Sequence, residues 1–117
     1  MESEIKMQVE KLLEKTKEGK VDWKQINQNA IRWTRISNGI SYIVTLQTSI
    51  TGIINSVSVK QFILTIQSNT GEVILQLQSN QQINSEYFTL LQTLFELALK
   101  DTKAKSANIL NNLLDDL

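Results

Sequence analysis

Between residues 25 and 85 the chain carries only four charged side chains, in a segment where apolar and polar residues alternate. The four are Arg32, Arg35, Lys60 and Glu72. Alternation with a period of two is typical of strands that bury one face and expose the other to solvent. The segments on either side are rich in charge and place their apolar residues at helical spacing instead. We therefore expect an α+β fold with the order helix, sheet, helix.

Four strands are predicted in the weakly charged segment, over residues 30–36, 40–48, 62–67 and 73–78. Asn38-Gly39 is a strong signal for a two-residue hairpin turn, and residues 69–71 form a second turn. Residues 51–58 fit either a loop or a further edge strand. The expected sheet is antiparallel, has about four strands, and leaves one face open to water or to a partner.

The N-terminal segment is predicted to be an amphipathic helix. Ile5, Val9, Leu12 and Leu13 form one apolar stripe. Gly19 stands where a residue in the left-handed conformation would end the helix. Val21 and Trp23 follow as an apolar pair, and we expect them to pack on the core.

The C-terminal segment is predicted to be a long helical region that Ser85 can cap and whose wide apolar stripe runs from Tyr87 to Leu99. Polar residues 101–106 predict a break or bend there. A second apolar stripe follows, made of Ile109, Leu110, Leu113, Leu114 and Leu117. This second stripe either folds back on the sheet or packs against another subunit. We expect a homo-oligomer, because soluble monomers avoid exposed patches of this kind.

The composition narrows the possible functions. The 117 residues suit a single domain spanning 1–117. The chain has no His and no Cys, which removes the commonest general base and the commonest metal ligands, so we expect neither an enzyme nor a metal site, and no cofactor. Twelve basic residues balance twelve acidic ones, which argues against binding nucleic acid by neutralising phosphates. Long apolar runs and a secretory signal pattern are both missing, so we expect no membrane association and a cytoplasmic location.

Arg32 and Arg35 are the only arginines, and they flank Trp33. A guanidinium group grips a phosphate with two hydrogen bonds and stacks on aromatic rings. Strand alternation places Trp33 and Arg35 on one face and Arg32 on the other. Alternatively, both arginines are solvated charges that protect an edge strand. Glu72 is either a solvated turn carboxylate or a partner for an arginine or a ribose hydroxyl.

Phe88 is the aromatic residue that departs from the inward stripe of the last helix. Such a residue covers another helix, lines a pocket or lies in an oligomer interface. Glutamine and asparagine side chains gather at the expected strand ends and before the last helix. They can hydrogen-bond base edges, or they simply keep a wet sheet face soluble. The members are Gln61, Gln67, Gln76, Gln78, Asn80, Gln81 and Gln82.

Three segments, at the two ends of the chain, resemble a known family. Residues 9–23 (VEKLLEKTKEGKVDW), residues 94–99 (LFELAL) and residues 109–117 (ILNNLLDDL) are similar to the ends of small bacterial and phage domains with a helix–sheet–helix layout. These domains include the phage anti-Thoeris sponge proteins of the first type. The resemblance implies an oligomer that sequesters cyclic ADP-ribose-type or cyclic dinucleotide signals without cleaving them. It also implies that Arg32 or Arg35 is a ligand-binding strand arginine, and that Phe88 is the aromatic near the last helix. The C-terminal region departs from the pattern, because it contains Lys103 and Lys105 but no arginine.

Two hypotheses for function follow. The first is a non-catalytic protein that sequesters a small cyclic nucleotide immune signal, a phage anti-defence sponge acting in the host cytoplasm. The second is a protein-interaction or assembly module, such as an accessory subunit or an antitoxin-like partner, that works through its leucine-rich tail and open sheet edge.

Overall fold

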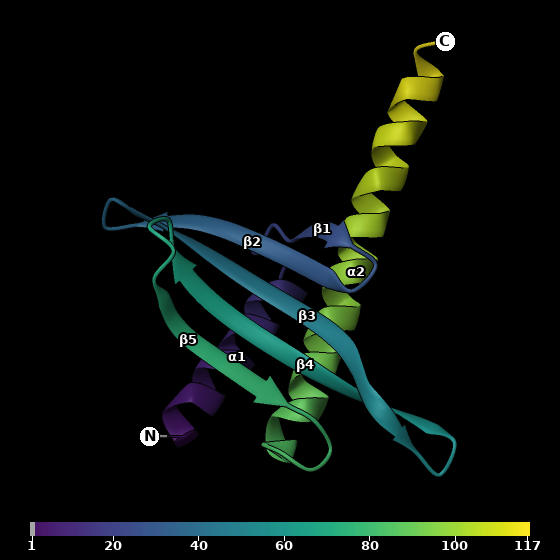
Figure 1. The fold of residues 1–117 in the computed structure, drawn as a ribbon. Helices are drawn as coiled ribbons and strands as arrows, with labels where there is room; N and C mark the ends of the chain where they lie inside the picture. Colours follow the sequence, from purple (N-terminus) through teal and green to yellow (C-terminus); the bar gives the residue numbers. More distant parts are fainter. Residues whose placement is uncertain (1) are drawn as a thin grey trace.

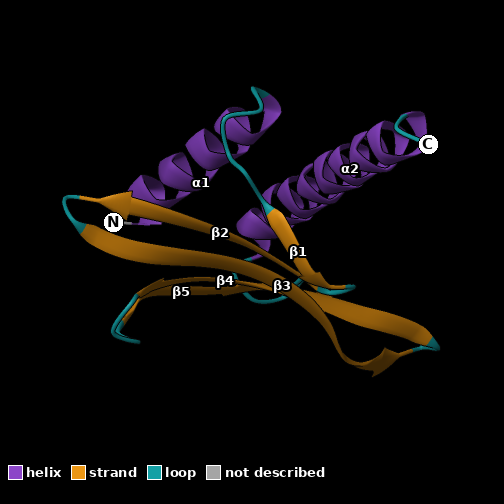
Figure 2. Cartoon of the chain, turned by 90° about the horizontal axis from the view of Figure 1, so that it is seen from above, coloured by secondary structure: helices purple, strands orange, loops and turns teal. Residues whose placement is uncertain are grey.

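Two helices pack on one face of an antiparallel sheet (Figure 1), and the view from above separates the helical layer from the sheet layer (Figure 2). The computed structural model describes residues 2–117, and within these residues five strands form one sheet in chain order. The elements are α1 (Glu2–Lys17), β1 (Lys24–Asn27), β2 (Ala30–Ser37), β3 (Ile40–Ile54), β4 (Val57–Ser68), β5 (Val73–Ser79) and α2 (Ser85–Asp115). The predicted α+β class and the order helix, sheet, helix are confirmed.

The core lies between the sheet and α2, and one cross-strand row forms its centre. Ile31 on β2 pairs in register with Leu46 on β3, which pairs with Leu64 on β4. Leu64 in turn pairs with Leu77 on β5, so four strands contribute one apolar residue each. All four are buried, and α2 covers them with its own fully buried residues. These are Leu91, Leu94 and Ala98.

The end of α1 confirms the role predicted for Gly19. Gly19 has a φ of 74°, and its N–H donates to the Thr16 carbonyl over 3.0 Å. The N–H of Lys20 donates to the Lys15 carbonyl over 3.0 Å. This pair of hydrogen bonds is the Schellman motif, which satisfies the last carbonyls of a helix. The chain then turns back, and Val21 and Trp23 enter the core as predicted.

Trp23 ties α1 to the sheet. Its ring is buried and lies 6.2 Å from the ring of Trp33 on β2. The Trp23 Nε1–H donates to Thr16 Oγ1 over 3.0 Å, and the Thr16 hydroxyl donates to the Leu12 carbonyl over 2.9 Å. The buried indole thus keeps its hydrogen bond while its ring contributes apolar area.

The sheet has one strand more than predicted. Strand β1 was not predicted, because its residues, Lys-Gln-Ile-Asn, do not alternate between apolar and polar side chains. All four are exposed in the structure. It forms because β2 offers a free edge and a short connection brings the chain back alongside it. The β2–β3 turn at Asn38-Gly39 has φ values of 52° and 77°, which confirms the predicted hairpin.

The undecided segment 51–58 belongs to a long hairpin arm. β3 and β4 stay paired from the sheet out to Asn55 and Ser56, which turn with φ values of 52° and 65°. A bulge between Ile50 and Gly52 interrupts the register at the base of the arm. The arm extends beyond the other strands (Figure 1).

The predicted break at residues 101–106 is wrong, because α2 is one continuous helix of 31 residues. The segment contains no Gly and no Pro, so nothing in it opposes helical geometry. Two local interactions also support the turn there. Lys105 Nζ lies 3.2 Å from Asp101 Oδ2, and Ser106 Oγ donates to the Thr102 carbonyl over 3.0 Å. The polar stretch marks the place where the helix leaves the sheet.

The buried indole hydrogen bond can be tested by replacing Thr16 with valine. Thr16→Val keeps the volume but leaves the Trp23 N–H without a partner, so we expect a loss of about 1–3 kcal/mol in the free energy of unfolding. Thr93→Val is the matched control, because the Thr93 hydroxyl only donates to the Thr89 carbonyl on an exposed turn. Urea unfolding followed by tryptophan fluorescence measures both. Equal losses in the two variants would show that the indole hydrogen bond does not matter to stability.

Candidate binding surfaces

Arg32 lies on the open face of the sheet. Strand alternation turns Ile31 toward the helices, so Arg32 points the other way and is exposed. Its row across all five strands is polar and contains no aromatic residue. The row is Lys24, Arg32, Thr45, Thr65 and Gln76. Arg32 therefore has neighbours that can hydrogen-bond a ligand but none that can stack on one.

Arg35 lies on the same face as Trp33, as the alternation predicts. It is exposed, and its register partner on β3 is Tyr42, a half-buried residue. Trp33 is also half-buried and packs against the core next to Trp23. Arg35 thus has two rings near it on one sheet face, whereas Arg32 has none. The two arginines cannot form a single clamp.

Glu72 lies in the turn between β4 and β5 and is exposed. Its carbonyl oxygen accepts a hydrogen bond from the Ser68 N–H over 2.9 Å. A hydrogen bond from the Asn69 N–H to the Ser41 carbonyl, 2.9 Å long, holds this turn beside β3. Glu72 is therefore at the same end of the sheet as Arg35. None of the ion pairs among residues 2–117 includes Glu72 or either arginine.

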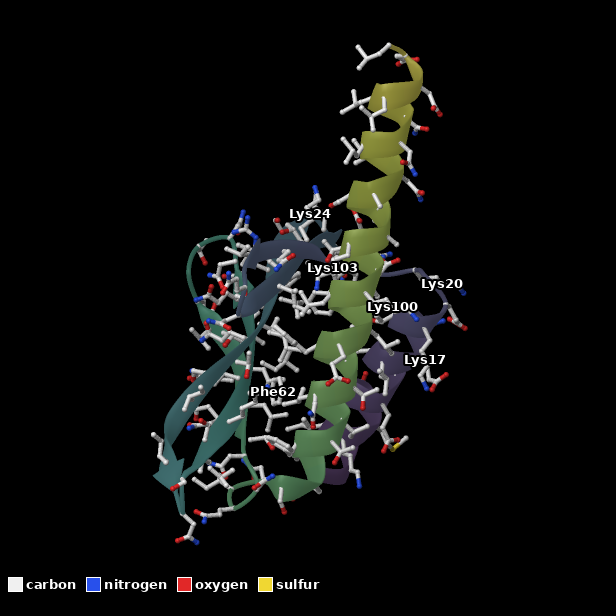
Figure 3. The ribbon with its side chains drawn as sticks, turned by 90° about the vertical axis from the view of Figure 1, so that its right-hand side faces the viewer. Lys17, Lys20, Lys24, Phe62, Lys100 and Lys103 are labelled. Atoms are coloured by element: carbon white, nitrogen blue, oxygen red, sulfur yellow. The ribbon has the colours of Figure 1, made fainter. Side chains whose placement is uncertain are left out.

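Phe88 lies at the opposite end of the sheet, beside the hairpin arm. It is half-buried, and its ring meets the ring of Phe62 edge-on with the centroids 5.5 Å apart. The ring centroids of Phe62 and Phe95 are 5.9 Å apart. Phe62 is labelled in Figure 3. Phe88 lines a hollow of about 460 Å³. The structure does not bring Phe88 together with the arginines.

Lys60 is the cation that lines the same hollow as Phe88, and it is not among the site residues predicted from the sequence. It lines the Phe88 hollow and also an adjoining hollow of about 360 Å³ that Phe95 lines. The alternation of β4 could have indicated Lys60, since it has the same strand parity as Phe62 and Leu64. That parity places Lys60 on the helix-facing side of β4.

The C-terminal end of α2 projects beyond the sheet (Figure 1; Figure 3 shows the same helix from the side). Thr102 is its last buried residue, and every residue from 103 to 117 is exposed. The second apolar stripe lies on this projecting end, and its first four members are 55–61% exposed. The alternative in which the stripe folds back on the sheet is therefore wrong. We call residues 103–117 the projecting end.

At the base of the projecting end, Lys105 contacts two acidic residues. Lys105 Nζ donates to Asp22 Oδ1 over 2.8 Å and lies 3.2 Å from Asp101 Oδ2. This hydrogen bond holds the pKa of Asp22 below its usual value and raises the pKa of Lys105. Because these side chains are exposed, solvent screens the pair and its contribution to stability is small.

A groove of about 700 Å³ runs between β1 and the base of the projecting end. Trp23 and Lys24 line one side, and Thr102, Lys105 and Ile109 line the other. In residues 2–117 no three His, Cys, Asp or Glu side chains gather where they could hold a metal ion. No described helix is long and apolar enough to cross a membrane.

Comparisons with known proteins do not assign the chain to a family: no family model, no curated protein and no solved structure matches it.

Proposed function

We propose that this chain is a non-catalytic assembly module that pairs with a second copy of itself through the projecting end of α2. The observation that carries the proposal is the exposure of five aliphatic side chains on the last nine residues. At 100° per residue they fall within one stripe about 140° wide, so a single partner can cover them together. The stripe consists of Ile109, Leu110, Leu113, Leu114 and Leu117.

Helix energetics support a partner for this segment. Most helix stability in proteins comes from packing one apolar face, whereas a helical extension in water has only its intrinsic propensity. Residues 103–115 have little packing of their own beyond the Lys105 contacts at the base. A second apolar helix would supply this packing. The same stripe on a second copy can do so, because identical stripes face each other in a two-fold pair.

Charge and shape favour antiparallel pairing. Lys103, which makes no ion pair within residues 2–117, lies at the base of the projecting end beside the Lys105 contacts with Asp22 and Asp101, and Asp115 and Asp116 lie at its tip. Antiparallel helices bring the base of one copy beside the tip of the other, so that opposite charges meet. Parallel helices would place acid beside acid and would crowd the two sheets at one end. In the antiparallel pair the two sheets lie at opposite ends of the shared helical segment.

Pairing is tested by replacing Leu113 and Leu114 together with glutamine. We expect the wild-type protein to be a dimer or larger at micromolar concentration, and the Leu113→Gln/Leu114→Gln variant to be a monomer with an intact fold. Asn111→Gln/Asn112→Gln is the control, because these positions lie on the opposite side of the same helix. Light scattering after size exclusion gives the mass, and circular dichroism reports the fold. A monomeric wild type, or a double leucine variant with unchanged mass, contradicts the proposal.

We also propose a second function, sequestration of a small cyclic nucleotide signal without its cleavage, in the cytoplasm of a bacterium or of a phage-infected host. The favouring observation is that exposed Arg35 pairs with Tyr42 across the strands and shares its sheet face with Trp33. A guanidinium group on the phosphate with a base resting on a nearby ring is a common way to bind such a ligand.

Arg35→Ala tests this second function. Losing a charge-assisted hydrogen bond should weaken binding of cyclic ADP-ribose or cyclic di-GMP about 10- to 100-fold, while the melting temperature stays the same because Arg35 is exposed. Arg32→Ala is the matched control on the same strand and the opposite face. Heating the complex should release intact ligand. If neither nucleotide binds the wild type, or Arg35→Ala binds as wild type does, this function is wrong.

A further inference from the structure

We infer that the two adjoining hollows around Lys60 form a binding site for a small anionic ligand that carries a flat ring. The site lies at the end of the sheet opposite Arg35, and it does not depend on pairing of the projecting ends. It shares a ligand class with the second proposed function but does not use Arg35, Trp33 or Tyr42.

The charge around the hollows is positive. Lys60 lines both hollows, and no acidic side chain lines either of them among the described residues. Lys60 also has no ion-pair partner in residues 2–117. An ammonium group without a nearby carboxylate leaves the local potential positive, and a concave surface concentrates that potential. The hollows therefore favour an anion.

The hollows also have an aromatic wall. Phe88 lines one hollow and Phe95 lines the other, and both rings pack against Phe62. The two hollows thus share one aromatic cluster, and Phe88 remains half-exposed within it. An exposed ring face beside a cation is suited to a ligand with a planar apolar part next to its charge.

Three glutamine side chains supply polar groups at the Phe88 hollow. Gln81, Gln82 and Gln92 line the Phe88 hollow, and their side-chain amides make no hydrogen bond to a described residue. Each can both donate and accept, which is what the polar edge of a heterocycle needs. Ligand pockets commonly combine an apolar wall with a few such polar groups at volumes from about 300 Å³ upward.

The loop that carries Gln81 and Gln82 is held in place before any ligand binds. Asn80 Oδ1 accepts hydrogen bonds from the N–H groups of Gln82 and Ile83, over 2.7 and 2.6 Å. Asn84 then donates its side-chain amide to the Gln78 carbonyl over 2.9 Å. A loop fixed in this way loses little entropy when a ligand contacts it.

Titration with adenosine monophosphate, adenosine and inorganic phosphate tests the site. We expect adenosine monophosphate to bind most tightly, because only this probe offers both a charge to Lys60 and a ring to Phe88. Amide chemical shifts should change around residues 57–60, 81–82 and 88–92. Phosphate alone and adenosine alone should bind more weakly at the same place.

Lys60→Gln should weaken the binding of adenosine monophosphate about tenfold or more and leave adenosine unaffected. Lys11→Gln is the control, since Lys11 is an exposed lysine on α1 away from the hollows. Phe88→Leu keeps an apolar contact with Phe62 but removes the ring, so it should weaken both adenosine and adenosine monophosphate and spare phosphate. Melting temperatures confirm that each variant is folded.

Arg35→Ala separates this site from the second proposed function. Unchanged affinity for adenosine monophosphate in Arg35→Ala, together with a loss in Lys60→Gln, supports the Lys60 site. The opposite pattern, or shift changes around Arg35 and Tyr42, overturns it in favour of the Arg35 surface. Absence of saturable binding at millimolar adenosine monophosphate also overturns the inference.

Discussion

The contact between one sheet face and the first half of α2 is the interaction on which the rest of the structure depends. Ile31, Leu46 and Leu64 meet the buried residues of α2 in a single apolar layer. The opposite face of the sheet is polar along its central row, and no helix covers it, so its isoleucines, such as Ile36 and Ile74, stay exposed. Since burial of apolar area is the main favourable term in folding, this one layer holds strands from distant parts of the chain together. Trp23 then fastens α1 to the same layer through its ring and its hydrogen bond to Thr16.

The length of α2 creates two separate surfaces. The helix has 31 residues and is therefore about 46 Å long, but only the portion up to Thr102 packs on the sheet. Its N-terminal part, with Phe88 and Gln92, borders the Lys60 hollows. Its C-terminal part projects with the aliphatic stripe exposed. About 30 Å of helix separates Phe88 from Ile109, so a partner helix at the tip leaves the hollows uncovered. The two proposed binding surfaces therefore lie on separate parts of one small domain.

The alternation of β2 decides what the arginines can do. Neighbouring residues on a strand point to opposite faces, so Arg32 and Arg35, three residues apart, cannot serve one ligand. Arg35 has Tyr42 and Trp33 on its own face, whereas Arg32 has hydroxyl and amide neighbours. The same parity places Lys60 on the side of Phe62. Of the chain's few cations within the sheet, those on the helix-facing side are the ones that lie near aromatic rings.

The amino-acid sequence by itself determined the features that depend on local spacing. The apolar stripe of α1, the Gly19 terminus, the Asn38-Gly39 turn and the two faces of β2 all follow from periodicity and backbone preference, which neighbouring residues set. The exposed stripe at the C-terminus also follows from spacing, although its position in space does not.

Only the tertiary structure decided the features that depend on distant partners. β1 has no pattern of its own and forms because the edge of β2 is available. The polar residues 101–106 lie where α2 leaves the sheet and not where the helix ends, and only the packing of α2 on the sheet shows this. Lys60 and Phe88 are 28 positions apart in the chain. They line one hollow because the hairpin arm lies beside the start of α2. Such placements depend on how the packed layers align, and the spacing of residues along the chain does not specify that alignment.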